Sequence, residues 1–506
     1  MNENITKSTN SRLKRPASII FYLFVAAFAN PCLLIPADAI SQTGKEVPVI
    51  TGSDGRLVYT ADSLGNRVPD FSYCGYMSGE KPIPDAPVRI VIPAAEGDTT
   101  IRIQSAIDYV ASLPPDNNGI RGAVLLEKGI FQVNGTLHIH TSGIVLRGCG
   151  TGDNGTLLMG TGKDRGTLIS IAGINDQKKG PSCQVTDSYV PVNAMVVEIA
   201  YSGAFGIGDR IIISRPATQE WINDIRMDEF GGAIGWNSWK PGTRDLSWDR
   251  TIVAVNGNRI TFNAPLTTAI DIKYGGGFVA GYEWPGRISQ TGVENLCCVS
   301  SFDENNPKDE DHRWMAITME NVSDAWVRQV LFRHFAGSAV ALYETTRRIT
   351  VEDCKSLAPV SEIGGERRNT FFTSGQQTLF LRCYAEHGCH DFAAGYCAAG
   401  PNAFVQCESS LPFSFSGSID SWASGILFDI VNVEGDALSF TNLKQARQGA
   451  GWNAANSVFW QCTASRIDCD SPPTATNWVF GSWAEFSGDG EWHESNNHIR
   501  PRSLYF

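Results

Sequence analysis

This chain lacks the pattern of a helical protein. Across its 506 residues, one short segment excepted, apolar residues do not recur at the 3.6-residue spacing of an amphipathic helix. No segment beyond the N-terminal region is apolar enough to cross a membrane. There are 13 cysteines, yet no Cys-x-x-Cys pair or His/Cys set has the spacing of a zinc site. Helical bundles, membrane-spanning domains and zinc modules are therefore excluded.

Positive charge is also in deficit. The formal net charge is −12, from 41 basic and 53 acidic residues. A protein of this charge repels the phosphates of nucleic acid, so we expect no nucleic-acid partner. A basic groove can still exist locally, so an acidic polysaccharide stays open as a partner. Nothing in the sequence calls for an oligomer, and a monomer is expected.

The N-terminus has the three parts of an export signal. A basic region precedes the apolar stretch 19–35, and Ala37-Asp38-Ala39 offers a cleavage site. Residues 1–39 are thus predicted to be a signal peptide, and the protein to be secreted or periplasmic. A lipid anchor on Cys32 is the weaker alternative, because Asn30-Pro31 is a poor context for lipidation.

A short apolar segment recurs through residues 293–480, bounded by Gly, Ser, Asn and Asp as strands are. Four copies end in a polar residue followed by cysteine, and the first three of these cysteines lie roughly 25 residues apart. Repeats of this length without helices must stack on one another to bury their apolar side. The sequence therefore predicts an all-β parallel β-helix, a solenoid. The four cysteines are Cys354, Cys383, Cys407 and Cys462.

Cysteine at the end of successive strands fits an inward ladder, because a free thiol packs as a small hydrophobe. Cys297 lies on a further predicted strand and is assigned to the core in the same way. Two pairs lie close enough in sequence to form disulfides, although spacing does not establish connectivity. These pairs are Cys389 with Cys397 and Cys462 with Cys469.

The remaining chain divides around this repeat. Residues 40–90 read as an N-terminal arm, and 91–184 as an N-terminal cap with the first coils. The cap is a short amphipathic helix over 101–113 that closes the open end of the solenoid. Residues 185–275 break the rhythm and predict a small antiparallel β insertion, which either walls a groove or decorates the surface. The main coils occupy 276–506.

Specific motifs then suggest a family. The segments 98–108, 122–133, 137–139 and 142–150 resemble the pectate-lyase superfamily domain of the pectin-lyase-like right-handed β-helix proteins. The run 382–392, followed by 400–404, is similar to secreted pectate-lyase-like proteins of polysaccharide-degrading bacteria. The resemblance covers most of residues 65–506. It implies a right-handed coil and a polysaccharide lyase that cleaves a uronate-containing glycan by β-elimination.

Between Lys355 and Asp391, polar and charged residues are more frequent than the strands and turns of a solenoid require. Lys355, Tyr384 and Glu408 directly follow cysteines of the repeat, so they should lie on one face about 5 Å apart. β-Elimination needs a cation to neutralise the uronate and a base to remove the C5 proton. We therefore assign four catalytic candidates, namely His390, Arg368, Tyr384 and Lys355.

Further residues are assigned to substrate binding, and three carboxylates could hold calcium or orient the bases. Several candidates have a structural alternative. Arg367 and Arg368 could form ion pairs with Glu362 or Glu366, and His387 could cap a turn. His334 could be a half-buried core histidine, and Trp422 could be a core residue and not a platform for a sugar ring. The binding candidates are Arg367, His387, His334, Trp422, Asp420, Lys444 and Arg447. The calcium candidates are Glu362, Glu386 and Asp391.

Two other functions stay open. A glycoside hydrolase would use a pair of carboxylates drawn from Glu362, Glu366, Glu386, Asp391 and Asp420. A non-catalytic glycan-binding β-helix would need none of them. The acid pairs of polygalacturonases and the calcium motif of pectate lyases are absent, so pectate as substrate does not follow from the resemblance.

Overall fold

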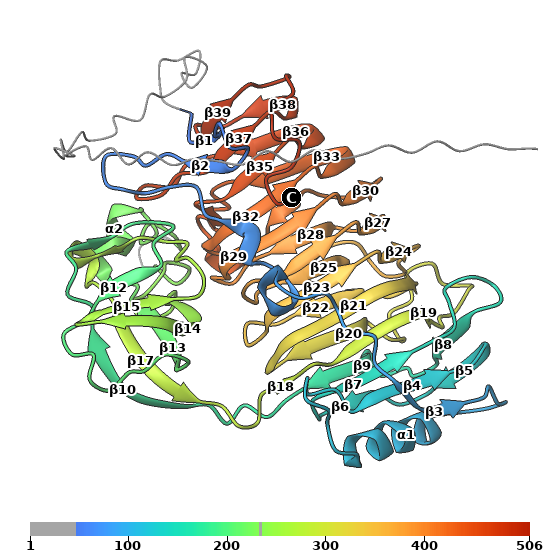
Figure 1. The fold of residues 1–506 in the computed structure, drawn as a ribbon. Helices are drawn as coiled ribbons and strands as arrows, with labels where there is room; N and C mark the ends of the chain where they lie inside the picture. The colour runs from blue at the N-terminus through green and yellow to red at the C-terminus, as the bar shows by residue number, and fades with distance from the viewer. Residues whose placement is uncertain (1–46, 232–234) are drawn as a thin grey trace, which may run out of the picture.

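The structure is a computed structural model that describes residues 47–231 and 235–506. The predicted signal peptide, with Cys32, lies outside the described residues. Within them, no helix combines the length and the apolar character that a membrane span needs. Figure 1 shows a stack of parallel strands that runs from a helix at one end to the C-terminal strands at the other.

The chain is a right-handed parallel β-helix, as predicted. Crossover connections between parallel strands favour this hand. Each coil contributes to three faces, here called sheets 1, 2 and 3. Sheet 1 contains β4 (Gly122–Leu126), β7 (Ile144–Arg147), β19 (Gly292–Ser300), β21 (Val322–Arg333), β23 (Arg347–Glu352), β26 (Leu379–Leu381), β29 (Ala399–Val405), β32 (Ala423–Asp429), β35 (Val458–Trp460), β37 (Trp478–Phe480) and β39 (Glu491–His493).

Sheets 2 and 3 follow in each coil, and several long strands bend from one sheet into the next. Sheet 2 contains β5 (Gly129–Val133), β8 (Thr156–Gly160), the ends of β19 and β21, β24 (Lys355–Leu357), β27 (Tyr384–Glu386), β30 (Glu408–Ser410), β33 (Asn432–Phe440), β36 (Thr463–Cys469) and β38 (Trp483–Ser487). Sheet 3 contains β6 (Leu137–Ile139), β9 (Thr167–Ala172), β20 (Met315–Glu320), β22 (Val340–Leu342), β25 (Asn369–Thr373), β28 (His390–Ala394), β31 (Ser416–Ser418) and the ends of β33 and β36.

Helix α1 (Thr100–Ser112) caps the first coils together with β3 (Val88–Ile92), as the periodicity predicted. Its buried face consists of Ile103, Ala106, Ile107 and Val110. Asp98 accepts a hydrogen bond from the Thr100 backbone N–H at the start of the helix. The helix covers the apolar end of the solenoid, which stacking alone would leave exposed to water.

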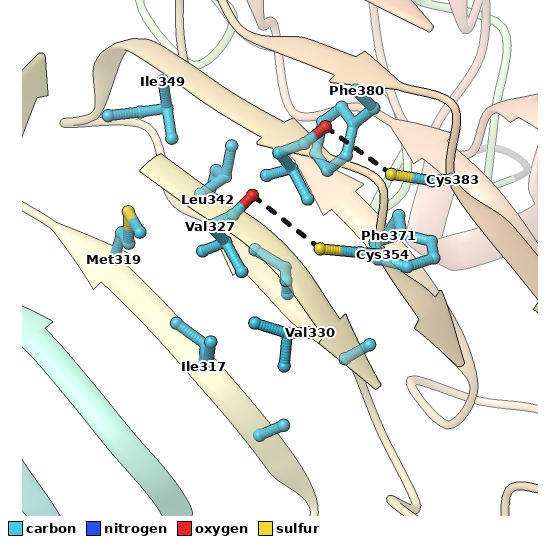
Figure 2. Packing of buried hydrophobic residues seen from close by; sticks show 14 of the residues in the cluster. Ile317, Met319, Val327, Val330, Leu342, Ile349, Cys354, Phe371, Phe380 and Cys383 are labelled. Atoms are coloured by element: carbon cyan, nitrogen blue, oxygen red, sulfur yellow. Dashed lines mark hydrogen bonds between the residues drawn. The ribbon is translucent and has the colours of Figure 1, made fainter. Parts of the chain in front are cut away.

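Aromatic and aliphatic side chains stack in register along the interior. The ladder on sheet 1 passes through three consecutive phenylalanines, Phe380, Phe404 and Phe428, each fully buried. Their ring centroids lie 4.8 and 4.7 Å apart. Figure 2 shows the earlier part of this core. Its close packing is what fixes one coil on the next.

The predicted cysteine ladder is confirmed: Cys354, Cys383, Cys407 and Cys462 are buried in this core. Each thiol faces the carbonyl of a ladder residue one coil below, such as Val327 for Cys354 (Figure 2). The polar residue before each of these cysteines has a positive φ of 48–54° and makes the corner between two sheets. All the cysteines in the described residues are free, so neither candidate disulfide forms.

The insertion is confirmed as a small antiparallel β structure beside the coils (green in Figure 1). Its main sheet has the order β10-β17-β13-β14-β15-β12. Trp221, Trp239 and Trp422 form one apolar cluster that attaches it to the upper coils. The elements are β10 (Lys178–Gln184), β11 (Tyr189–Val190), β12 (Val196–Glu198), β13 (Arg210–Arg215), α2 (Gln219–Asp224), β14 (Leu246–Asn256), β15 (Arg259–Phe262), β16 (Ile270–Asp271), a 3-10 helix (Ile272–Tyr274) and β17 (Phe278–Glu283).

The N-terminal arm lies along the outside of sheet 1 (blue in Figure 1). Val68 and Phe71 of the arm pack on Leu427 and Trp460 of the coils. This contact covers apolar side chains that would otherwise face water. The arm has β1 (Val49–Thr51), β2 (Leu57–Tyr59) and two 3-10 turns (Phe71–Tyr73 and Tyr76–Gly79). Short elements elsewhere are β18 (Ile288–Ser289), β34 (Ala454–Ala455) and α3 (Ala446–Gly449).

Candidate active site

Sheet 2 carries the register that the cysteine spacing predicted. Lys355 pairs with Tyr384, and Tyr384 with Glu408, on β24, β27 and β30. The Tyr384 hydroxyl lies 3.5 Å from Glu386 Oε2. Lys355 lies beside Asp353 in a separate surface pocket. Lys355 and Tyr384 are therefore on a different sheet from His390, and the four catalytic candidates do not form one site.

Arg368 is a structural residue, which corrects its assignment as a uronate-binding cation. It is 7% exposed and donates from Nε to Ser361 Oγ at 2.9 Å and from Nη2 to the Ser361 carbonyl at 2.8 Å. Nη1 donates to the His387 carbonyl at 3.1 Å. These bonds hold the loop before β25 against the turn before β28. Removing Arg368 would leave buried acceptors without donors and would destabilise the protein.

Arg367 is also committed to the protein, though to a different partner from those expected. It forms a two-pronged ion pair with Glu310 and lies over the ring of Trp314. Neither Glu362 nor Glu366 takes this place. Nε and Nη2 of Arg367 are therefore committed to Glu310.

The proposed calcium ligands do not come together. Among residues 47–231 and 235–506, no group of three or more His, Cys, Asp or Glu side chains is placed to hold a metal ion. Glu362 pairs with Lys308 at 3.0 Å, and Glu386 accepts from the Ala358 N–H at 3.0 Å. Asp391 is fully buried. Spacing in sequence suggested a cluster, but the corner between sheets 2 and 3 separates its members.

Asp391 is held by two hydroxyls. Thr370 Oγ1 and Ser409 Oγ each donate to it at 2.7 Å. Burial raises its pKa to about 6, against the lowering effect of these hydrogen bonds. The folded protein therefore binds a proton here that the unfolded chain releases between about pH 4 and 6. The stability that this group contributes is complete at low pH and is lost as pH rises through about 6.

Asp391→Asn is expected to remove that loss. An amide has no charge to bury, so the unfolding free energy of the variant should fall less than that of the wild type between about pH 4 and 6, by up to about 3 kcal/mol. Urea unfolding at a series of pH values measures the difference. Asp153→Asn on the surface is the control, and parallel curves for Asp391→Asn and the wild type would contradict the assignment.

Three further candidates turn out to be packing residues. Trp422 is 0% exposed and packs between the insertion and the coils, so it is core and not a sugar platform. His334 is half-buried with its ring 4.9 Å from Phe302, the alternative expected for it. His387 occupies a turn at φ 56° with its ring 6.2 Å from Phe413.

A groove runs between the insertion and the turns that join sheet 3 to sheet 1. It encloses a pocket of about 280 Å³. On the coil side, Glu344, Gln376 and Tyr396 come from successive turns. The insertion supplies Lys179, Asp245, Asp249, Trp284 and Arg287. The insertion is therefore a wall of this groove, one of the two roles considered for it.

The wall is fixed by a buried ion cluster. Asp249 accepts from Arg287, Arg347 and, at 2.7 Å, the Tyr282 hydroxyl. Burial alone would raise the pKa of Asp249, but Arg347 and Arg287 outweigh it and the pKa is lowered. Since Arg347 belongs to a coil and Arg287 leads out of the insertion, this cluster ties the two parts together. These charges set the geometry of the wall and are not free for a substrate.

The polar centre of the groove is Tyr396, whose side chain is 45% exposed. Glu366, Asp420 and Arg447 surround it closely enough to shift its titration: burial and the two carboxylates raise the pKa of Tyr396, while Arg447 lowers it. Arg447 also pairs with Glu366 at 3.1 Å. A hydroxyl, a cation and two carboxylates thus meet at one point.

Backbone strain marks the same place. Tyr396, Cys397, Trp422 and Arg447 all have positive φ, between 41° and 56°. Side chains other than glycine adopt this region at a cost, which packing elsewhere must offset. The residues before the ladder cysteines have the same positive φ, so this geometry belongs to the turns of the solenoid in general.

His390 lies on the same outer face, at the start of β28, and is 8% exposed. Its Nδ1 lies 2.7 Å from the Phe415 carbonyl, so the neutral ring carries its proton there and Nε2 is left as an acceptor. Burial lowers the pKa of His390 to about 4, with Arg447 adding to the effect. His390 is therefore neutral at physiological pH.

Between His390 and Tyr396 the face is apolar. Phe372, Ala393 and Ile419 form a small cluster outside sheet 3, and Phe372 lies edge-on to Tyr396 with centroids 5.9 Å apart. These three side chains are at most 8% exposed, so they support the ring of Tyr396 and do not themselves face a ligand. The candidate site is therefore Tyr396 with the polar groups around it.

Tyr396, the residue at the centre, was missed by the sequence argument. It lies outside the dense polar run and next to glycine, so it read as an ordinary turn. The sequence did contain a signal for Tyr396. A turn of a solenoid lies outside the core, so a large aromatic side chain there is not needed for core packing. Of the predicted residues, Asp420 and Arg447 act electrostatically on Tyr396, and Lys444 lies exposed on the loop before Arg447.

Comparisons with known proteins bear on the fold. No protein-family model matches the chain, and no curated protein matches its sequence. Among solved structures, the tailspike gp49 from Pseudomonas phage LKA1 is 14% identical over 76% of this chain, with a TM-score of 0.46. The polygalacturonase of Erwinia carotovora ssp. carotovora is 9% identical over 82%, with a TM-score of 0.34. The alginate lyase of Paenibacillus sp. str. FPU-7 is 8% identical over 81%, with a TM-score of 0.32.

These alignments differ in how much of the other protein they include. They cover 97% of the polygalacturonase and 99% of the alginate lyase, but this chain spans only 64% of the length of the tailspike. At such identities the likeness extends to the fold alone. The parallel register of the coils carries the β-helix fold that the sequence motifs predicted.

Proposed function

We propose that this protein is a secreted enzyme that cleaves a uronate-containing glycan by β-elimination in the groove at Tyr396. The observation that carries the proposal is that Tyr396, a residue 45% exposed at the groove, lies within electrostatic reach of Arg447, Glu366 and Asp420. A structural role would not require Tyr396 to face water. Two proteins of similar fold, a polygalacturonase and an alginate lyase, are named for the glycans on which they act, which agrees with a glycan as ligand.

The roles follow from charge and protonation. Arg447, with Lys444 beside it in sequence, faces the uronate carboxylate and makes the C5 proton more acidic. Neutral His390 accepts that proton at Nε2. Tyr396, kept protonated by its raised pKa, gives a proton to the oxygen that leaves C4. The protonation states fit these roles, because a general base must start without the proton and a general acid with it.

The test is the product. Incubation with alginate, pectins, glucuronans and glycosaminoglycans should yield unsaturated uronate ends, detected by their absorbance near about 235 nm, on at least one glycan, because β-elimination leaves a C4–C5 double bond. Arg447→Gln should abolish the signal. Silence across the whole panel would count against the lyase.

A hydrolase is the second candidate, because Glu366 and Asp420 both lie close to Tyr396. Asp420 keeps one oxygen on the Ser421 N–H and hydroxyl at 2.6 and 2.7 Å. Two carboxylates across a glycosidic bond can act as acid and base or nucleophile. New reducing ends without the absorbance of unsaturated products would select this function. Binding without any change in chain length would select a non-catalytic glycan-binding protein.

A further inference from the structure

A second pocket lies where the N-terminal arm, the insertion and the upper coils meet. Its volume is about 700 Å³, and it shares no lining residue with the groove. The arm contributes residues 60–68, the insertion contributes Arg215 and Tyr274, and the coils contribute Thr474 and Trp478. Three separate parts of the chain are therefore brought together around one cavity.

Arg215 is the unusual member of this pocket. It ends β13 and is 2% exposed, yet its Nε and Nη1 are buried without a hydrogen-bond partner. Asp271 acts on Arg215 electrostatically, but within the described residues no carboxylate satisfies these two nitrogens. Its guanidinium lies 4.3 Å from the ring centre of Trp221 and 5.8 Å from that of Tyr274. The two rings hold the cation in place and supply no hydrogen-bond acceptor.

This arrangement is costly for the protein alone. A buried cation without a counter-charge or acceptors is strongly disfavoured, and native proteins retain few such groups. Burial lowers the pKa of Arg215 only to about 10, so it stays charged at neutral pH. A ligand that supplied an anionic oxygen would offset this cost.

The other charged groups near the pocket already have partners. Asp62 accepts from the Leu64 and Asn66 N–H groups at 2.8 Å, and Lys273 pairs with Asp224 at 2.6 Å. Asp271 accepts from the Lys273 N–H at 2.8 Å. None of these carboxylates bonds to Arg215, which leaves it available to an incoming anion.

We propose that this pocket binds the carboxylate of an acidic saccharide through Arg215. A planar guanidinium matches a carboxylate, and the Tyr and Thr side chains that line the pocket suit sugar hydroxyls and ring faces. The four threonines of the lining are Thr60, Thr268, Thr474 and Thr476. The site would hold a glycan on the enzyme at a distance from the groove. The choice of a uronate rests on the proposed function, whereas the anion site rests on Arg215.

Binding of sodium glucuronate and galacturonate, measured by calorimetry, tests the proposal. Glucose, inorganic phosphate and inorganic sulfate serve as comparison ligands. Arg215→Gln should weaken uronate binding at least tenfold, while the variant melts at the same temperature as the wild type or higher, since a buried charge is removed. Arg210→Gln, at the exposed opposite end of β13, is the matched control and should bind as the wild type does.

Two further variants separate the possible outcomes. Arg447→Gln removes the cation of the groove, so uronate that still binds to this variant binds in the pocket, and we expect this binding to remain. Adding Ala475→Tyr to Arg447→Gln should block the pocket without touching Arg215 and should abolish this binding, which covers the case that Arg215→Gln fails to fold. Uronate binding that is unchanged in folded Arg215→Gln and disappears only with Arg447→Gln would overturn the pocket and leave the groove standing. No uronate binding to the wild type, or binding of phosphate and sulfate in preference, would overturn it as well.

Discussion

Tyr396→Phe is expected to lower turnover of the glycan by about 10²–10⁴-fold, the usual contribution of a positioned proton donor. The change removes one oxygen from a side chain that is 45% exposed, and the ring can still lie against Phe372. The melting temperature should therefore hardly change. Initial rates of product formation, with KM and kcat separated, measure the effect, and the loss should be in kcat.

Tyr384→Phe is the matched control for this experiment. It makes the same chemical change on β27 of sheet 2, away from the groove, where the hydroxyl lies 3.5 Å from Glu386 and also contacts Ser410. Its turnover should equal that of the wild type. Equal losses in both variants, or a loss in Tyr384→Phe alone, would move the site to sheet 2 and refute the groove.

Phe404→Ala is expected to lower the unfolding free energy by about 3–5 kcal/mol, the range for deleting a buried aromatic side chain. Phe404 is fully buried between Phe380 and Phe428, with stacked rings 4.8 and 4.7 Å away. The cavity would sit between coils, so it would weaken two interfaces of the stack together. Urea unfolding followed by circular dichroism measures the loss.

Phe413→Ala is the comparison for stability, because this phenylalanine is 48% exposed in a loop. Its loss should cost less than about 1 kcal/mol, as most surface substitutions do. If the two alanine variants unfolded at the same urea concentration, the phenylalanine ladder would not be the principal source of cohesion between the coils.

The interior of this fold could be predicted from the sequence with little loss. The alternation of apolar and polar residues along a strand predicts which side of the strand faces the interior. The Gly, Asn and Asp residues between strands predict where the chain turns. Cys383 and Cys407 followed from this logic, because each occupies the same place in its repeat. The register of Lys355 with Tyr384 and Glu408 followed as well.

The site was predicted only in part, since a functional cluster depends on which faces meet. Tyr384 and His390 are only six positions apart in the sequence. The corner between sheets 2 and 3 lies between them, so their side chains face different directions. Arg368 makes buried hydrogen bonds and Trp422 packs in the core, so neither side chain is available to a ligand. Tyr396 became recognisable only when Arg447, from a later coil, was placed beside it.

What the sequence by itself determined is the repeat and its inward face, because hydrophobic burial acts on each short strand through local alternation. Only the tertiary structure decided where the charges meet. The insertion folds back over the coils, its buried Asp249 joins Arg287 to Arg347, and the groove exists because of that contact. Pairings between residues about a hundred positions apart depend on packing geometry, which no local pattern encodes.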